Sequence, residues 1–275
     1  TGKGVKVAIL DTGIDGAHPD FRGRVTAWKD FVDPDGPKAD EPRDPNGHGT
    51  HVAGIVAGSG RASEGGFRGV APEAELIVAR VLDEAGNGRT STVMAGVEWA
   101  VEQGAQVINI SLGGPPFPSD GTDALSYLCN AAVDQGVVVC AAAGNLGPSG
   151  HTVGSPGAAA KVITVGACEG DRLSPVDRVA RFSSRGPTAD GRSKPDLVFG
   201  PLRRHHPGRG TGRALHGALG HQPGHASGHG HGGPGAGGQP APAAGRGQAP
   251  PGPGCRGPAG GRGPGPGRGP RRCLP

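Results

Sequence analysis

The stretch that decides the fold is residues 7–15, Val-Ala-Ile-Leu-Asp-Thr-Gly-Ile-Asp. An uninterrupted apolar run ends at Asp11, and a glycine follows shortly after it. A short apolar run bounded by turn-forming residues predicts a strand that is buried on both faces. A carboxylate at the end of such a strand can orient a partner group, although an isolated Asp at this position serves equally often to close the strand.

Similar apolar runs recur along the chain and alternate with helical patterns. The pattern predicts strands at Val5–Leu10, Leu76–Leu82, Val107–Leu112, Val137–Ala143 and Val162–Val165, and helices at Ser91–Gln103 and Asp123–Gln135. Continuous apolar strands that alternate with helices predict an α/β fold, a parallel sheet with helices on both faces. Such sheets bind ligands at the carboxyl ends of their strands, so the residues after each strand are the candidates for chemistry.

The composition changes after Val198, which we take as a domain boundary. Residues 199–275 hold ten Arg and no Lys, Asp or Glu. Subtracting these ten from the 28 Lys and Arg of the chain leaves 18 against 24 Asp and Glu, so residues 1–198 carry about −6 and the tail about +10. The tail has one aromatic residue, Phe199, and no Val or Ile, so it cannot bury enough apolar surface to fold. We expect a Gly/Pro/Arg/His-rich disordered tail over 199–275.

Composition also bears on membranes and cysteine chemistry. No run of about 18 apolar residues occurs, so no membrane span is predicted. No basic-then-apolar leader is visible at the start of the chain. Cys129, Cys140 and Cys168 have no metal-ligand spacing, and we expect small buried hydrophobic residues there whose disulfide state stays open.

Two histidines lie in residues 47–54, Gly-His-Gly-Thr-His-Val-Ala-Gly. The small residues around His48 predict a helix that starts against neighbouring backbone and leaves one imidazole exposed. A neutral imidazole held by a carboxylate is the standard general base for a hydroxyl nucleophile. The spacing of His48 and His51 would also suit a metal pair, but no third ligand lies at a suitable spacing. We therefore take His51 as a packed helix residue.

Two further strand ends carry candidate groups. Asn145 follows the run Ala142-Ala143-Gly144, and its amide could donate to a developing oxyanion or simply close the strand. The segment Ser111-Leu112-Gly113 could offer a backbone edge to an extended peptide, or be an ordinary exit from a strand.

Five ordered motifs in residues 1–198 resemble those of the subtilisin-like serine peptidases, family S8. They are DTGID at 11–15, HGTHVAG at 48–54, INISLGG at 108–114, AAAGN at 141–145, and FSSRGP at 182–187 followed by KPD at 194–196. The resemblance implies a subtilisin-like fold and a secreted serine endopeptidase that acts as a monomer on peptide or protein substrates. It implies that no cofactor is required, although a structural calcium ion is compatible with it.

The same resemblance assigns roles to individual residues, and these roles are carried over from the family. Asp11 would be the orienting acid, His48 the general base and Asn145 an oxyanion donor. The substrate cleft would be lined by Ser111, Leu112 and Gly113 and by Ala142, Ala143 and Gly144. Residues 182–187 would form a structural loop, which leaves Ser183 and Ser184 without a nucleophilic role.

The resemblance stops before the nucleophile. The Gly-Thr-Ser-Met-Ala stretch that the family places after KPD is missing, and Ser227, the one serine after Val198, has no apolar helix behind it. Back-translating Leu215–Gln222 and reading from the second base of each codon can yield Tyr-Thr-Ala-Leu-Ser-Gly-Thr-Ser. We therefore interpret the tail as the product of a one-base frame slip near codon 200. The catalytic domain over 1–198 would then be partial, with no protease activity expected from the chain as printed.

Three functions of different classes stay open. The first is the serine endopeptidase, damaged or misread in its C-terminal part. The second is a catalytically dead module that keeps the peptide cleft at Ser111–Gly113. The presence of Asp11, His48 and Asn145 disfavours this module, because peptide binding alone would not require all three. The third is a nucleic-acid binder acting through the Arg-rich tail, but no aromatic residues that could stack on bases are interleaved with its arginines.

Overall fold

The computed structural model describes residues 1–116, 118–169 and 178–200. All of these residues belong to one unit of the chain. Of the predicted tail, 199–275, residues 201–275 lie outside the described residues, and these include Ser227 and the stretch 215–222. In the ranges that are described, no helix is long and apolar enough to cross a membrane.

The predicted strands and helices are present, with ends shifted by one to a few residues. The strands are β1 (Lys6–Asp11), β2 (Val25–Asp30), β3 (Glu75–Arg80), β4 (Val107–Ile110), β5 (Val138–Ala142), β6 (Ile163–Glu169), β7 (Arg178–Val179) and β8 (Leu197–Phe199). The helices are α1 (His48–Ala57), α2 (Thr90–Glu102) and α3 (Ala124–Asp134), with short 3-10 turns η1 (Pro19–Phe21) and η2 (Arg61–Ser63).

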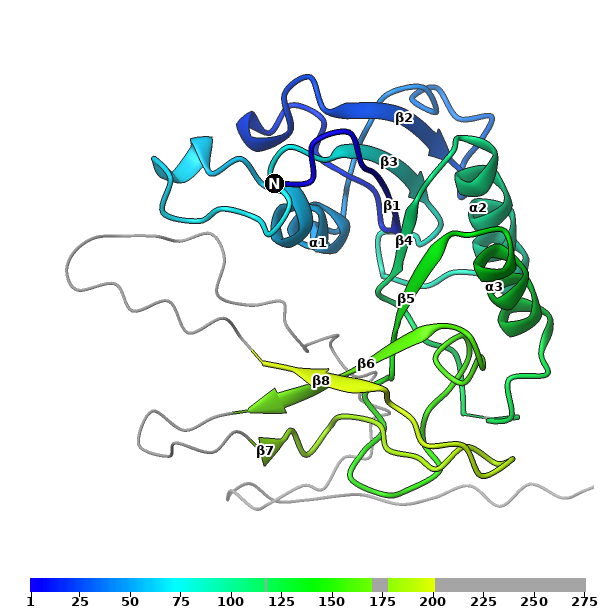
Figure 1. The fold of residues 1–275 in the computed structure, drawn as a ribbon. Helices are drawn as coiled ribbons and strands as arrows, with labels where there is room; N and C mark the ends of the chain where they lie inside the picture. Colours follow the sequence, from blue (N-terminus) through cyan, green and yellow to red (C-terminus); the bar gives the residue numbers. More distant parts are fainter. Residues whose placement is uncertain (117, 170–177, 201–275) are drawn as a thin grey trace, which may run out of the picture. The chain divides into compact units, whose positions relative to one another are not determined.

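The sheet has the strand order β2-β3-β1-β4-β5-β6-β7, and β8 pairs with β6. Every pair from β2 to β6 is parallel, as is the β6–β8 pair, whereas β7 runs antiparallel to β6. Figure 1 shows α1 on one side of the sheet and α2 and α3 on the other. The predicted fold class, a mainly parallel sheet with helices on both faces, is confirmed.

Alternate residues of the central strand β1 serve the two layers of the core. Ala8 and Leu10 belong to the apolar cluster beneath α2 and α3. Val7 and Ile9 belong to the cluster beneath α1. Because successive side chains of a strand point to opposite faces, a strand that is covered on both faces must be apolar at every position. This requirement explains the uninterrupted run that precedes Asp11.

The strand β2 was not predicted. Among the strands that the structure describes it pairs only with β3, at the edge of the sheet. Most of its residues are half-buried or exposed, including Thr26 and Lys29, and only Asp30 is buried. An edge strand is partly solvated, so its sequence lacks the continuous apolar run by which the inner strands were found.

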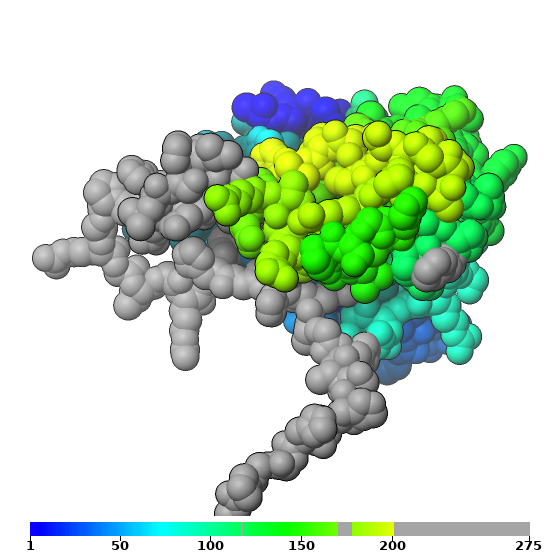
Figure 2. All heavy atoms as spheres, turned by 90° about the horizontal axis from the view of Figure 1, so that it is seen from below, coloured from blue at the N-terminus to red at the C-terminus, as the bar shows by residue number. Residues whose placement is uncertain are grey.

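The segment between β7 and β8 contacts the loop that precedes α3. Ala189 N donates to Ser119 O at 2.7 Å, and the Arg192 guanidinium donates to Asp120 O at 2.8 Å. In Figure 2 this yellow-green to yellow part of the chain lies beside the green atoms of the preceding segments. The segment therefore covers the loop that leads into α3.

Candidate active site

Asp11 and His48 meet at the carboxyl edge of the sheet. Asp11 is the last residue of β1 and is fully buried, whereas His48 is the first residue of α1 and its side chain is 21% exposed. His48 Nδ1 lies 2.7 Å from Asp11 Oδ1, and Thr12 N donates to the same oxygen at 2.7 Å. The carboxylate of Asp11 therefore binds Nδ1 of the imidazole and not Nε2.

Two glycines allow the two segments to approach each other. A Cβ on Gly13 would lie 2.0 Å from Arg43 O, and Gly13 has a φ of +121°, which L side chains rarely adopt. A Cβ on Gly49 would lie 2.2 Å from Gly13 O. The loop after Asp11 and the first turn of α1 are thus in backbone contact, and no larger residue fits at either position.

The Asp11 hydrogen bond changes the acid–base properties of the imidazole. It raises the pKa of His48 above its ordinary value, while partial burial acts in the opposite direction. The negative charges of Asp11 and of Asp44, which precedes α1, raise this pKa further. The other oxygen of Asp11, Oδ2, is buried and has no hydrogen-bond partner among the described residues.

The segments predicted to line a cleft lie next to each other. β4 and β5 are parallel neighbours beyond β1, so the residues after them, Ser111 and Asn145, follow strand ends at the edge that carries Asp11. A Cβ on Gly113 would lie 3.9 Å from Gly144 Cα, so the two backbones run close together. Gly113 and Asn145 are exposed. Ser111 Oγ accepts a hydrogen bond from Asn109 Nδ2 at 2.9 Å.

Ser183 and Ser184 lie where a structural role requires them. Both side chains are buried, and Ser183 Oγ accepts a hydrogen bond from Ala167 N at 3.0 Å. Ser184 Oγ accepts from Leu146 N at 3.1 Å, and Ser184 N donates to Gly144 O at 2.9 Å. Ser184 therefore holds both sides of Asn145, a contact that the sequence reasoning did not foresee.

Metal binding by the two histidines finds no support in the described ranges. These residues contain no group of three or more His, Cys, Asp and Glu side chains that could hold a metal ion. His51 is half-buried within α1.

The family of this chain follows from its similarity to known proteins. The Subtilase family, Peptidase S8, matches residues 2–209. The chain belongs to the subtilase family. Serine protease AprX of Bacillus subtilis (strain 168) is 45% identical to this subtilase over 209 residues, which are 72% of the chain and 46% of AprX. The chain thus spans about half the length of this relative.

Further relatives and a solved structure agree with this membership. The major intracellular serine protease of Bacillus subtilis (strain 168) is 38% identical over 218 residues, covering 78% of this subtilase and 65% of the relative. The minor extracellular protease Vpr of the same organism is 47% identical over 176 residues, 62% of this chain and 21% of Vpr. The structure of Sphericase superposes with a TM-score of 0.61 at 35% identity, covering 72% of this chain and 66% of that one.

Proposed function

We propose that this subtilase chain carries the acid–base part of a serine endopeptidase site. The observation that supports the proposal best is the 2.7 Å contact between the buried carboxylate of Asp11 and His48 Nδ1, at the carboxyl edge of the sheet. Asp11 would fix the tautomer with a proton on Nδ1 and stabilise the imidazolium. His48 Nε2 would then take the proton of a hydroxyl nucleophile and later give it to the leaving amine.

The substrate would bind as an extended peptide between the two adjacent segments, Ser111–Gly113 and Ala142–Gly144. Gly113 is exposed and Ala143 is buried, so the peptide would bind to the backbone groups of these segments, which can form hydrogen bonds with a peptide of any sequence. The amide of Asn145 would donate to the oxyanion that forms on the scissile carbonyl, where one such donor contributes about 10²–10³ in turnover. The serine-rich loop at 182–187 would take no part in the chemistry.

We propose that the nucleophile is encoded beyond residue 200 but out of frame. Without it His48 has no hydroxyl to activate, and no acyl-enzyme can form, so the chain as printed should be inactive. Sequencing the DNA around codon 200 tests the frame slip: one base inserted or deleted should restore Gly-Thr-Ser. If no single-base change does so, the frame-slip hypothesis is wrong.

A fluorophosphonate probe tests the peptidase assignment. We expect no labelling of the chain as printed and one label per chain after the frame is corrected. The corrected chain with His48→Ala should not be labelled. If a folded, corrected chain stayed unlabelled but still bound peptides, the peptide-binding module would replace the peptidase.

Other properties of the proposed enzyme rest on the family alone. The names of the relatives include both an extracellular and an intracellular protease, and secretion is our proposal between them. We also propose a monomer that needs no cofactor for the chemistry. A structural calcium ion stays a proposal without assigned ligands.

A further inference from the structure

The helix that carries His48 begins without a conventional cap. Its N-cap residue is Gly47, which has no side chain to bind the first amides. The unpaired N–H groups of a helix start need partners. Here three different side chains supply them: Asn46 Oδ1 accepts from His48 N at 3.1 Å, Thr12 Oγ1 from Gly49 N at 2.9 Å, and Asp44 Oδ2 from Thr50 N at 2.8 Å.

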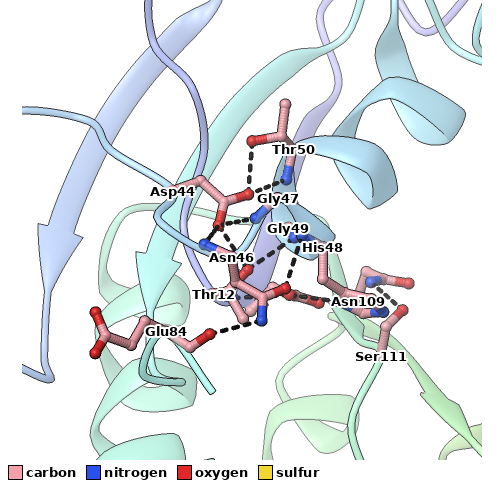
Figure 3. A network of polar contacts seen from close by, with 11 residues as sticks. Thr12, Asp44, Asn46, Gly47, His48, Gly49, Thr50, Glu84, Asn109 and Ser111 are labelled. Carbon is pink, nitrogen blue, oxygen red and sulfur yellow. Dashed lines mark hydrogen bonds and ion pairs between the residues drawn. The ribbon is translucent and has the colours of Figure 1, made fainter. Parts of the chain in front are cut away.

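Asp44 is the centre of this arrangement (Figure 3). Its Oδ1 accepts hydrogen bonds from Thr12 Oγ1 at 2.8 Å, from Gly47 N at 2.8 Å and from Asn46 N at 3.2 Å. Its Oδ2 accepts from Thr50 N and, at 2.6 Å, from Thr50 Oγ1. One carboxylate therefore binds the residue after Asp11 and residues on both sides of His48.

We propose that Asp44 is a positioning residue that holds the His48 imidazole against Asp11. The inference rests on the proposed function, because it concerns the general base of that site. Thr12 connects the two groups: its N–H binds Asp11 Oδ1, and its hydroxyl donates to Asp44 while accepting from Gly49 N. Both partners of the 2.7 Å contact are thus tied to the same carboxylate, and small displacements at such a site lower turnover strongly.

The negative charge of Asp44 favours the start of α1, as its hydrogen bonds do. A negative charge at a helix N-terminus is favourable, because the unpaired N–H groups there carry partial positive charge. Asp11 on β1 and Asp44 in the loop before α1 are the charged groups that raise the pKa of His48. Burial opposes the ionisation of Asp44 itself, but hydrogen bonds from Thr50, Gly47 and Thr12 outweigh it and lower the pKa of Asp44.

The test uses the chain as printed and measures the state of the His48 imidazole instead of enzyme turnover. NMR of ¹⁵N-histidine-labelled protein would follow the His48 Nδ1–H resonance and the His48 titration. Asp44→Asn keeps the shape but removes the charge and two acceptor sites. The control variant is Asp33→Asn. Asp33 lies in the same loop, between β2 and α1, and its carboxylate is 52% exposed and pairs with Arg43.

A second pair of variants separates positioning from general stability. Thr12→Val keeps the volume of the side chain but removes the hydroxyl, and Thr12→Ser keeps the hydroxyl. We expect a lower His48 pKa and a weakened Nδ1–H resonance in Asp44→Asn and Thr12→Val. The Thr50 amide should exchange with solvent at least tenfold faster in Asp44→Asn, as expected for the loss of a charge-assisted hydrogen bond. Asp33→Asn and Thr12→Ser should resemble the wild type.

The proposal is overturned if folded Asp44→Asn or Thr12→Val shows the wild-type His48 titration and Nδ1–H resonance. If Asp44→Asn does not fold, the Thr12 pair decides the question alone. A failure of this kind would leave the fluorophosphonate experiment unaffected. Conversely, a corrected chain that is not labelled would refute the peptidase without changing the titration of His48.

Discussion

Gly13→Ala gives the sharpest test of how the site is built. The added methyl group would lie 2.0 Å from Arg43 O, the carbonyl that already accepts a hydrogen bond from Ile14 N at 3.1 Å. The carbonyl would have to move, and the hydrogen bond would be lost or lengthened. Arg43 directly precedes Asp44, so the displacement would reach the start of α1.

The magnitude follows from three contributions. A non-glycine residue held at the φ of +121° costs about 1–3 kcal/mol. Forcing a methyl group into packed backbone costs about 1–3 kcal/mol, and the weakened hydrogen bond about 1 kcal/mol. We expect a decrease of about 4 kcal/mol in the free energy of unfolding, since these contributions are only partly additive.

Gly23→Ala is the matched control. Gly23 also has a positive φ, +73°, but a Cβ there would meet nothing within 4 Å. Only the backbone conformation is then penalised, by about 1–2 kcal/mol. Urea unfolding followed by the fluorescence of Trp28 and Trp99 measures both variants, with equal m-values as the check that the comparison is valid. Equal stability of the two variants would refute the close contact between Gly13 and Arg43.

Three further predictions concern charge and cysteine chemistry. Asp30→Asn should lower the free energy of unfolding by about 3 kcal/mol or more, because Asp30 and Arg80 are both buried and form an ion pair at 2.8 Å. Asp134 forms an exposed pair with Lys161, so Asp134→Asn should change the free energy of unfolding by less than about 1 kcal/mol in the same urea titration. The pKa values of Asp30 and Asp44 are lowered in the folded state, because hydrogen bonds outweigh burial, so the unfolded chain takes up protons first as the pH falls. The stability that these two carboxylates contribute is complete above about pH 4 and is lost as the pH falls through their folded pKa values. When unfolding is measured between pH 5 and 3, the free energy of unfolding should therefore decline less in Asp44→Asn than in the wild type. Burial, assisted by the charge of Asp123, raises the pKa of Cys129 to about 12, so iodoacetamide at pH 8 should leave Cys129 unmodified in the native protein and modify it in urea, as read by peptide mass spectrometry.

Burial on both faces made β1 and β3 predictable, because a strand that is covered on both sides is buried along nearly its whole length, whereas in β4, β5 and β6 buried residues alternate with partly exposed ones. The five mainly apolar runs became β1, β3, β4, β5 and β6, and the alternation of strands with helices predicted that the sheet is parallel. The order of the strands in the sheet was not predicted. The edge strand β2 was missed since solvent on one side removes that constraint. Its Asp30 illustrates the limit, because a buried carboxylate depends on Arg80 and Arg43, which are distant in sequence.

The sequence by itself determined the fold class, the family and the identity of the candidate acid and base, because each belongs to a short motif with local constraints. Only the tertiary structure decided how those groups are held. The 2.7 Å contact between Asp11 and His48 depends on a backbone approach at Gly13 and Gly49 and on the carboxylate of Asp44. These contacts join segments from different parts of the chain, and no local pattern specifies which distant donor a carboxylate will meet.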